Sequence, residues 1–369
     1  MKQVLVTGGC GFIGRYVVDE LLSQDYRVRV LDSFVEQVHG GAVPAMPAGV
    51  EVLHGDVRDA QLVKQALEGV EGVVHLAAEV GVGQSMYEIS RYVGGNDLAT
   101  AVLLENMIGS AVKRIVVASS MSVYGEGLYL AGDGTRQAAV RRRSASIRAG
   151  QWNPTGPDGG ALRPVPTDEQ KPVDLNSIYA LTKYAQEREV LIFGEAYNVD
   201  AVALRLFNVF GPGQALSNPY TGVLANFASR LANGQAPMIF EDGEQQRDFV
   251  HVRDIARAFR LALEQRPAAG HVINIGSGNA YPIRQVATLL ASAMGVPEIE
   301  PEIMNKARSG DIRNCFADIS KARELLGFEP QYRLEDSLEE LAEWVREAGA
   351  VEDRGTEMRR QLEERGLVS

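Results

Sequence analysis

Cysteine is scarce in this sequence. Only Cys10 and Cys315 are present, far apart and without the spacing of metal ligands. A disulfide framework and a zinc site are therefore not expected, and we predict no bound metal and a reducing, cytoplasmic environment. Long apolar runs are also lacking, since none approaches the roughly 18 residues that a bilayer-spanning helix needs. The N-terminus has one lysine and then a strand pattern where a signal peptide would carry an apolar core, so we expect no membrane partner.

Basic residues are fewer than acidic ones. The chain has 37 lysines and arginines against 48 aspartates and glutamates, which gives a net charge of -11. This balance argues against non-specific binding to nucleic acid, which needs a basic surface. The length of 369 residues and the hydrophobic fraction of 45% allow a sizeable core, in two domains or in one large domain with a satellite.

Short β-rich runs alternate with helical patterns over the first 120 residues. Strand patterns lie at 3–6, 26–32, 50–56, 72–78 and 114–120, and helical patterns follow Gly14 and lie at about 59–68 and 97–108. Strands rich in Val, Ile and Leu, separated by helices, predict a parallel sheet covered on both faces. We therefore predict an α/β fold with a doubly wound parallel sheet that binds ligands at the carboxyl ends of its strands.

The pattern breaks between Glu126 and about Val165, where Gly, Pro and Arg are frequent. A long irregular stretch in a compact domain is usually a functional loop, an oligomer contact or a mobile flap. Regular patterns return with a helix at 177–193, a strand running into a turn at 199–212, a strand at 272–278 and an amphipathic helix at about 284–294. The charged tail after about Glu352 is predicted to form a surface helix.

The first strand pattern is followed by a glycine-rich turn, TGGCGFIG (7–14). Gly9, Gly11 and Gly14 satisfy G-x-G-x-x-G, and Gly8, Gly11 and Gly14 satisfy a three-residue repeat. Glycines here allow a tight turn, a close approach of the backbone to a pyrophosphate and close helix–strand packing, while the following helix presents its N-terminus to the anion. The turn lies between a strand and a helix, as a dinucleotide-binding motif requires.

Acidic and small residues follow at the ends of the next strands. Asp32 ends the second strand, 18 residues past Gly14. A carboxylate there accepts hydrogen bonds from the adenosine ribose and repels a 2′-phosphate, which favours NAD over NADP, although a plain turn residue is the alternative interpretation. Asp56 can reach the adenine, with Val57 packing on it. The small residues of HLAA (75–78) leave room for a flat cofactor against the backbone.

Between positions 177 and 187 the chain reads SIYALTKYAQE, with Tyr179 four residues ahead of Lys183. Residues at i and i+4 lie on one face of a helix. Taken alone, the pair favours packing over chemistry. A free phenol has a pKa of about 10, which is too high for an efficient base at neutral pH. The Lys183 ammonium and the positive ring of NAD⁺ would lower the pKa of Tyr179.

Several motifs in register resemble the extended short-chain dehydrogenase/reductase family of NAD-dependent sugar-nucleotide epimerases and dehydratases. They are TGGCGFIG, SSMSVYG (119–125), YALTK (179–183), RLFNVFGP (205–212), EDGEQQRDFVHVRDIARA (241–258) and RSGDIRNCFADISKA (308–322). The resemblance covers the chain from about residue 3 to 345 and implies a Rossmann NAD-binding domain with a smaller C-terminal α/β substrate domain. The implied NAD-binding domain comprises 1–211, with the insert at about 126–165, and the chain returns to it at about 236–265. The implied substrate domain comprises 212–235 and 266–345, and a charged tail follows at 346–369.

The resemblance implies that Ser120, Tyr179 and Lys183 are catalytic. Tyr179 then takes the proton of a sugar hydroxyl while a hydride leaves the same carbon for NAD⁺, Ser120 hydrogen-bonds that hydroxyl, and Lys183 also holds the nicotinamide ribose. The implied NAD-binding residues are Gly8, Gly11, Phe12, Ile13, Gly14, Asp32, Asp56, Val57, Leu76, Ala77, Ala78, Asn96, Ser119, Tyr179 and Lys183. For Asn96, a buried polar anchor and part of a proton path remain alternatives.

The second half is implied to bind a nucleotide-diphosphate sugar. Asn208 of the FNV motif holds the substrate near its pyrophosphate, and Phe207 lines the sugar site. Arg247 and Arg308 are expected on the diphosphate, whose oxygens suit planar guanidinium groups. Asp311 is expected on the nucleotide ribose.

The two positions after Ser120 favour one reaction. In similar 4,6-dehydratases an Asp–Glu pair stands there, and uronate decarboxylases place a Glu at the second position, but this chain has Met121 and Ser122. Neither residue can act as a carboxylic acid. This favours oxidation at C4 and return of hydride to the opposite face, the reaction of a 4-epimerase with tightly held NAD. A dehydrogenase or reductase, a UDP-glucuronate decarboxylase or epimerase, and a non-catalytic NAD-binding sensor are the alternatives.

The insert is longer than in most members of the family, with 55 residues from Tyr124 to Tyr179. This long form is most similar to the bacterial subgroup of dTDP-L-rhamnose 4-epimerases. The run from Arg141 to Arg143 has three interpretations: a cover over an anionic substrate, a contact with a second subunit, or part of a mobile surface loop. Similar proteins form homodimers through the helix at about 97–108 and the Tyr179 helix, so we expect a homodimer here.

Overall fold

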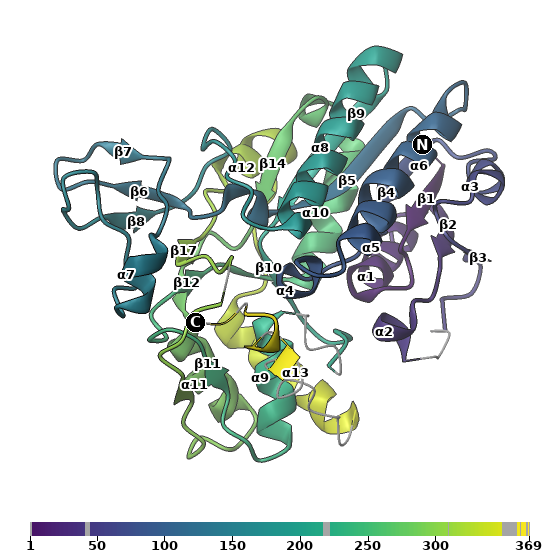
Figure 1. The fold of residues 1–369 in the computed structure, drawn as a ribbon. Helices are drawn as coiled ribbons and strands as arrows, with labels where there is room; N and C mark the ends of the chain where they lie inside the picture. The colour runs from purple at the N-terminus through teal and green to yellow at the C-terminus, as the bar shows by residue number, and fades with distance from the viewer. Residues whose placement is uncertain are drawn as a thin grey trace.

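A seven-stranded parallel sheet forms the centre of the molecule (Figure 1). In this computed structural model the described residues are 2–40, 45–216, 222–308 and 310–348, with 360, 361, 363–366 and 368 of the tail. The strands are β1 (Gln3–Thr7), β2 (Arg27–Asp32), β3 (Glu51–His54), β4 (Gly72–His75), β5 (Arg114–Ser120), β9 (Asp200–Leu206) and β14 (Val272–Ile275). Their order is β14-β9-β5-β4-β1-β2-β3, and every neighbouring pair is parallel. The predicted doubly wound sheet is confirmed.

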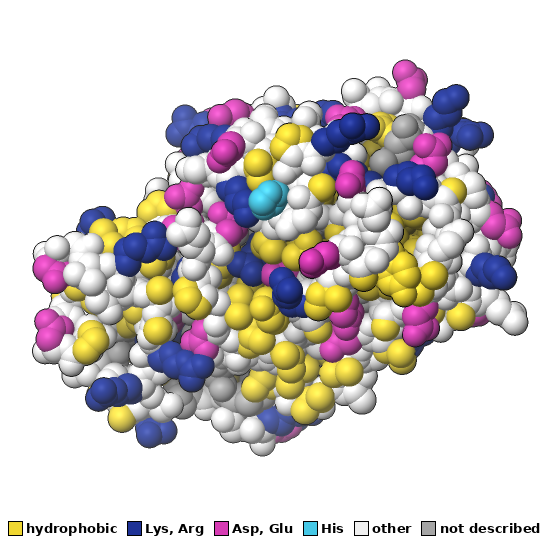
Figure 2. Space-filling model, turned by 90° about the horizontal axis from the view of Figure 1, so that it is seen from above, with side chains coloured by type: hydrophobic (Ala, Val, Ile, Leu, Met, Phe, Trp, Pro, Cys, Tyr) yellow, Lys and Arg dark blue, Asp and Glu magenta, His cyan; other side chains and the backbone are white. Residues whose placement is uncertain are grey.

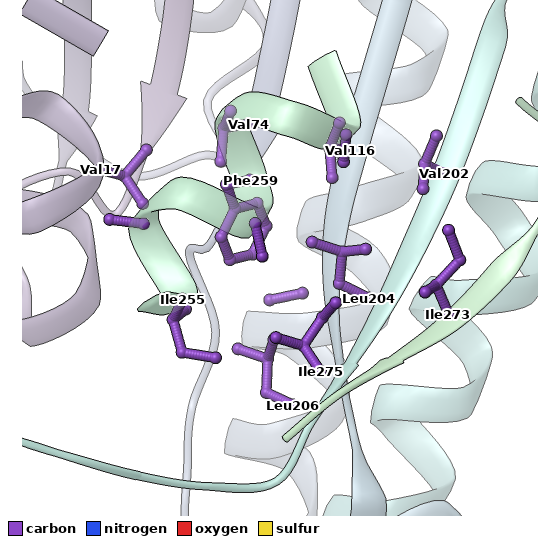
Figure 3. Packing of buried hydrophobic residues seen from close by; sticks show 14 of the residues in the cluster. Val17, Val74, Val116, Val202, Leu204, Leu206, Ile255, Phe259, Ile273 and Ile275 are labelled. Atoms are coloured by element: carbon purple, nitrogen blue, oxygen red, sulfur yellow. The ribbon is translucent and has the colours of Figure 1, made fainter. Parts of the chain in front are cut away.

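Helices cover both faces of this sheet. The main ones are α1 (Phe12–Leu22), α3 (Ala60–Ala66), α6 (Ala99–Met107), α8 (Ile178–Tyr197), α10 (Val252–Glu264) and α12 (Ser320–Leu326). Val4 and Val6 of β1 pack toward α1, α10 and α12, whereas Leu5 packs toward α3, α6 and α8. In Figure 3, Phe259 of α10 lies among aliphatic side chains of the central strands. Because alternate residues face opposite sides and both sides are covered, the strands read as continuous Val, Ile and Leu runs.

Short helices follow the strands near their carboxyl ends. They are α2 (Glu36–His39), α4 (Val82–Ser85), α5 (Ile89–Val93), the π-helix η1 (Gly94–Leu98) and the 3-10 helix η2 (Met121–Tyr124). A further 3-10 helix, η3 (Arg266–Ala268), precedes β14. The predicted helix at about 97–108 is therefore α6 preceded by a π-turn. Such turns widen a helix locally and are frequent at functional sites.

A smaller unit has its own apolar core. It contains α9 (Val223–Ala232), α11 (Ile283–Ala293), α13 (Leu334–Ala348) and the short strands β10 (Asn208–Phe210), β11 (Met238–Ile239), β12 (Gln246–Arg247), β13 (Phe249–His251), β15 (Tyr281–Pro282), β16 (Glu302–Ile303) and β17 (Asn314–Cys315). Phe227 of α9, Val286 of α11 and Leu338 of α13 belong to one buried cluster. This cluster is separate from the two that flank the large sheet.

Two boundaries differ from the sequence prediction. The segment 266–345 was assigned to the substrate domain, but β14 within it pairs with β9 in the large sheet. The predicted strand at 199–212 is two strands, because the chain leaves the large sheet after Leu206 and β10 pairs with β13. Both errors concern the pairing partner of a strand, which its own apolar pattern does not encode. The rest of the predicted domain division stays a prediction.

The insert at 126–165 was predicted to be irregular. In the structure it contains a small antiparallel sheet. Its elements are β6 (Leu128–Leu130), β7 (Arg136–Gln137), α7 (Ser144–Arg148) and β8 (Arg163–Val165), in the strand order β7-β6-β8. In Figure 1 this sheet projects from the left side of the molecule. The Gly–Asp–Gly stretch makes the turn between β6 and β7, where Gly134 has a φ of 84° and Asp133 accepts a hydrogen bond from the Thr135 nitrogen.

Arg142 of the insert is a structural residue. Its side chain is 5% exposed and pairs with Glu126 at 2.8 Å and with Glu241 of the smaller unit at 2.5 Å. A third bond runs to the Asp311 carbonyl oxygen at 2.7 Å. Arg141 is exposed and pairs with Asp174. Of the three interpretations of the arginine run, none describes Arg142, which fixes the insert to the smaller unit.

The surface seen from above in Figure 2 carries mixed charge. Basic and acidic side chains are interspersed there, with hydrophobic side chains between them. Across the described part of the chain, no helix combines the length and the apolar character needed to cross a membrane. The same residues contain no group of three or more His, Cys, Asp or Glu side chains placed to hold a metal ion. The tail predicted as a surface helix lies largely outside the described residues.

Candidate active site

A cleft of about 1070 Å³ opens at the carboxyl ends of the sheet strands. This edge of a doubly wound sheet is where ligands bind. Its walls follow β1, β2, β4, β5 and β9 and reach α9 of the smaller unit. The predicted site residues that line it are Gly8, Gly11, Phe12, Ile13, Gly14, Asp32, Asp56, Val57, Leu76, Ala77, Ala78, Ser119, Ser120, Tyr179, Lys183, Phe207 and Asn208.

The glycine-rich turn forms one wall of the cleft. Gly8 has a φ of 69°, and a Cβ placed on it would lie 2.8 Å from the Ala77 nitrogen. A Cβ on Gly14 would lie 2.2 Å from the Gly8 oxygen. Gly9 instead packs against β2 and is not a lining residue, so the set facing the cleft is Gly8, Gly11 and Gly14. The backbone can therefore approach a pyrophosphate closely, and the turn fits NAD.

Asp32 is fixed at the end of β2 with 7% of its surface exposed. Oδ2 accepts a hydrogen bond from the Cys10 nitrogen and Oδ1 one from the Phe34 nitrogen, both at 2.9 Å. Each carboxylate oxygen keeps a further lone pair, so the group can still accept hydrogen bonds from ribose hydroxyls. The geometry fits the predicted preference for NAD.

Replacing Asp32 by asparagine is expected to lower the preference for NAD over NADP by about tenfold or more, because the change removes the charge that repels a 2′-phosphate. The amide keeps the size of the side chain and one acceptor. Calorimetric titration of the cofactor-stripped protein with each dinucleotide gives the two dissociation constants. Asp133→Asn, an exposed change on the insert, is the control. An unchanged ratio in Asp32→Asn would contradict this role for the carboxylate.

Asp56 lies where the adenine end of a dinucleotide is predicted. Arg58 donates to it through Nε at 2.9 Å and Nη2 at 2.6 Å, and these hydrogen bonds lower the pKa of the carboxyl. Asp56 therefore stays ionised and acts as an acceptor. The wall beyond it is the small-residue segment 76–78 after β4, which leaves space beside the backbone.

Asn96 is the exception among the predicted NAD contacts, because it is not a lining residue of the cleft. It is fully buried in η1. Its Oδ1 accepts from the Glu79 nitrogen at 2.7 Å, and its Nδ2 donates to the Glu79 oxygen at 3.1 Å and to Thr182 Oγ1 at 2.9 Å. Of the two alternatives, the geometry is that of a buried polar anchor, which joins the segment after β4 to α8.

Ser120, Tyr179 and Lys183 meet in the cleft. Ser120 is the last residue of β5, and the other two lie one turn apart near the start of α8. This helix begins at a defined place because the Ser177 hydroxyl accepts a hydrogen bond from a backbone nitrogen of its first turn. The Tyr179 nitrogen donates to Ser85 Oγ at 3.0 Å, which ties α4 to the same turn.

Burial dominates the electrostatics of these residues. It raises the pKa of the Tyr179 phenol, while a hydrogen bond with Ser120 lowers it. It lowers the pKa of Lys183 to about 7, against the opposing effect of Asp97 and Glu187. The predicted lowering of the Tyr179 pKa by Lys183 is therefore not met in this structure, because burial has the larger effect. The positive ring of a bound NAD⁺ would favour the phenolate.

Met121 and Ser122 occupy η2 directly after Ser120 and line the cleft. The Ser122 hydroxyl donates to Ser120 Oγ at 2.9 Å, and its backbone nitrogen does so at 3.2 Å. These bonds orient the Ser120 hydroxyl. Neither side chain can protonate a leaving hydroxyl group, so the structure places no acid at the positions that dehydration needs.

The substrate side of the cleft begins after β9. Phe207 and Asn208 both line it. Asn208 Oδ1 is buried and has no hydrogen-bond partner among the described residues. A buried acceptor without a partner is costly. Its position in the cleft wall therefore fits a hydrogen-bond donor on a substrate.

The predicted phosphate and ribose contacts of the smaller unit are not lining residues of the cleft. The Arg247 guanidinium donates to the carbonyl oxygens of Gln246 at 2.9 Å and Arg313 at 3.0 Å. Arg308 pairs with Asp311 at 2.9 Å and lies over the Phe240 ring at 4.6 Å. The structure thus brings Arg308 and Asp311 together but satisfies each through protein groups. Their substrate roles stay predictions.

Sequence reasoning missed the polar residues that support Lys183. Gln186 accepts a hydrogen bond from its Nζ at 2.6 Å, and nothing in the sequence distinguishes this glutamine. Glu187 forms a buried ion pair with Arg205 at 2.6 Å. Arg205 did carry a signal, because a charged residue inside an apolar strand pattern needs a buried partner.

The profile of the NAD dependent epimerase/dehydratase family matches residues 4–146 and 155–276. The chain belongs to this family. A dTDP-L-rhamnose 4-epimerase from Burkholderia thailandensis is 38% identical over 351 residues, which are 93% of this chain and 95% of the relative. Because the match covers nearly the whole of both chains, it is not limited to a shared module.

Solved structures give the same assignment. A UDP-N-acetylglucosamine 4-epimerase from Methanobrevibacter ruminantium in complex with UDP-N-acetylmuramic acid is 30% identical, with a TM-score of 0.78 over 94% of this chain and 99% of that one. A UDP-glucuronic acid 4-epimerase from Bacillus cereus in complex with UDP-glucuronic acid and NAD is 25% identical, with a TM-score of 0.76 and the same coverage. This epimerase is an NAD-dependent enzyme of nucleotide-sugar metabolism.

Proposed function

We propose that the substrate of this nucleotide-sugar 4-epimerase is dTDP-L-rhamnose, inverted at C4. The reaction is supported above all by the meeting of Ser120, Tyr179 and Lys183 in one cleft that has Met121 and Ser122 where eliminating enzymes need acids. The substrate is supported by the 38% identical Burkholderia thailandensis relative, whose substrate is dTDP-L-rhamnose.

The side chains divide the work of the reaction between them. A bound NAD would supply a reversible hydride acceptor for C4, so that no net oxidation results. Tyr179 accepts the proton of the C4 hydroxyl as that hydride leaves and gives it back to O4 of the 4-keto sugar. Ser120 hydrogen-bonds the same oxygen, and the Lys183 ammonium stabilises the phenolate. Inversion requires the keto sugar to present its other face before the hydride returns.

The substrate contacts are part of the same proposal. Asn208, with its unpaired buried Oδ1, would accept a hydrogen bond from the substrate near its diphosphate, and Phe207 would line the sugar. Arg247 and Arg308 would bind the diphosphate only after exchanging the protein acceptors that they hold now, and Asp311 would accept hydrogen bonds from the nucleotide ribose once Arg308 has left it.

The test is an incubation of the purified protein, without added NAD, with dTDP-L-rhamnose, UDP-glucose and UDP-glucuronate. NMR of the sugar products then reports the configuration at C4. Inversion of dTDP-L-rhamnose alone is the expected result. Inversion of a UDP-sugar instead would replace the substrate but keep the reaction, whereas NADH or CO₂ would favour the dehydrogenase or decarboxylase. No conversion with NAD bound would favour a sensor.

We also propose a homodimer, based on an exposed apolar face of α5, η1 and α8. Its members include Val93 with 39% of its surface exposed, Leu98 with 53%, Leu181 with 45% and Ile192 with 56%. These helices contact one another. An apolar patch of this kind marks an interaction surface. The sequence predicts a dimer through the helix at about 97–108 and the Tyr179 helix, on which Leu98, Leu181 and Ile192 lie.

The double substitution Leu98→Glu with Ile192→Glu is expected to convert the dimer to a monomer, because each two-fold contact would then bury four new carboxylates. Light scattering after gel filtration reports the mass. Gln285→Glu, an exposed change on α11, is the control. A monomeric native protein would contradict the proposal, as would a double variant that keeps the dimer mass.

A cytoplasmic location is proposed from the two cysteines. Cys10 and Cys315 are both buried and unpaired. Burial raises the pKa of each thiol to about 12, so neither is reactive at neutral pH. Free thiols without a disulfide are typical of a reducing compartment.

A further inference from the structure

Lys183 has a neutral acceptor one helical turn away. Its Nζ donates to Gln186 Oε1 at 2.6 Å, and the two residues are 3% and 0% exposed. The neighbouring acid, Glu187, is engaged elsewhere, since it accepts bonds from Arg205 at 2.6 and 2.9 Å and from Ser119 at 2.8 Å. An amide and not a carboxylate therefore holds the ammonium group.

The orientation of the Gln186 amide is fixed by the groups behind it. Its Nε2 lies 2.8 Å from Thr100 Oγ1. The Thr100 hydroxyl lies 2.8 Å from the Asn96 carbonyl oxygen. A carbonyl oxygen can only accept, so Thr100 donates its single hydroxyl proton to Asn96. Thr100 Oγ1 must then accept from the amide nitrogen. The amide oxygen is left to face Lys183.

His75 completes this hydrogen-bonded chain. Its Nε2 lies 2.9 Å from Thr100 Oγ1 and its Nδ1 lies 2.7 Å from Thr7 Oγ1. Because the Thr100 proton is already used, Nε2 carries the ring proton and Nδ1 accepts from Thr7. Burial, and then the charge of Lys183, lower the pKa of His75 to about 3, so the ring stays neutral. Gln186 Nε2 and His75 Nε2 lie 3.3 Å apart, but both are donors. They donate to the same Thr100 oxygen and not to each other.

We propose that Gln186 is a positioning residue for Lys183. Its amide oxygen favours the ammonium form and fixes the direction of Nζ without cancelling the positive charge that Tyr179 needs. The ionisable groups that act on Lys183 are Asp97 of η1, Glu187 of α8 and the neutral ring of His75. The expected effect of Gln186 on turnover rests on the proposed epimerase reaction. Its hydrogen bond with Lys183 does not depend on that proposal.

The first test follows the Lys183 side chain directly and needs no sugar. In NAD-loaded protein labelled at the lysine side chains, an NMR titration gives the pKa of Lys183, with Lys183→Arg identifying its signal. Gln186→Met removes the acceptor and is expected to lower that pKa by about one unit, because a hydrogen bond to the charged form is lost. Gln186→Glu adds a negative charge at the same place and is expected to raise it.

The second test measures how turnover depends on pH. The alkaline limb of the kcat profile is expected to move to lower pH in Gln186→Met and to higher pH in Gln186→Glu, while Gln61→Met, an exposed change on α3, leaves it in place. A structural role alone would lower activity or stability in both variants without opposite shifts. The proposal would be overturned if the pKa of Lys183 stayed the same in both variants, or if it moved in the same direction in both. If Gln186→Met does not fold, the isosteric Gln186→Glu decides by itself.

Discussion

Replacing Tyr179 by phenylalanine is expected to lower kcat by about a hundredfold to ten-thousandfold, the range that general acid–base catalysis contributes. The change removes one oxygen atom and leaves the ring. The ring contact with Tyr92, whose centroid lies 6.4 Å away, can persist. The backbone bond from position 179 to Ser85 is also kept, because the main chain makes it. The loss therefore falls on proton transfer and not on the fold.

Tyr184→Phe is the matched control for this prediction. Tyr184 lies on the same helix, half-buried against the apolar cluster of the large sheet. Steady-state turnover of both variants is compared with their melting temperature and with the amount of NAD that remains bound after purification. Retention of more than about a tenth of the native kcat by Tyr179→Phe would rule out the phenol as the proton acceptor.

The cofactor half of the site could be predicted from the sequence because its requirements are local. The turn from β1 into α1 needs glycines where a Cβ would meet backbone atoms, and both such positions, Gly8 and Gly14, lie within one eight-residue motif. Asp32 follows from the same logic, since the end of the second strand lies beside that turn in any doubly wound sheet. Fold class and NAD binding were therefore predictable.

The substrate half was less predictable because it depends on tertiary partners. A motif places Arg247 and Arg308 in the smaller unit but does not show that one donates to carbonyl oxygens and the other pairs with Asp311. Asn96 shows the same limit, since its bonds reach Glu79 and Thr182 across the fold. Hydrogen bonds between distant segments leave no periodic pattern in a sequence.

The small sheet in the insert shows a different kind of limit. Its strands have two or three residues each, too short for an alternating pattern to be recognised. Ion pairs of Arg142 with Glu126 and Glu241 fix the insert, and their partners lie 16 and 99 residues away in sequence. The composition of the insert, rich in arginine and glycine, therefore predicts a loop, although ion pairs fix it to the rest of the structure.

A second large effect is expected at the buried ion pair between Glu187 and Arg205. Their side chains are 1% and 5% exposed, and the pair joins α8, which carries Tyr179 and Lys183, to β9. Arg205→Met leaves the Glu187 carboxylate buried, with Ser119 as its one side-chain donor among the residues that the structure describes. Removing one partner of such a pair costs about 3–5 kcal/mol. Urea unfolding followed by circular dichroism measures this loss.

The origin of that cost can be tested with a second substitution. If the uncompensated charge of Glu187 is the cause, then adding Glu187→Gln to Arg205→Met removes it and recovers a large part of the stability, because the amide can still accept a hydrogen bond from Ser119. Arg188→Met, an exposed neighbour on the same helix, is expected to change stability by less than about 0.5 kcal/mol. A double variant no more stable than Arg205→Met would contradict the uncompensated charge as the cause and would favour the packing over the Tyr124 ring, 4.7 Å from the guanidinium, which both variants lose.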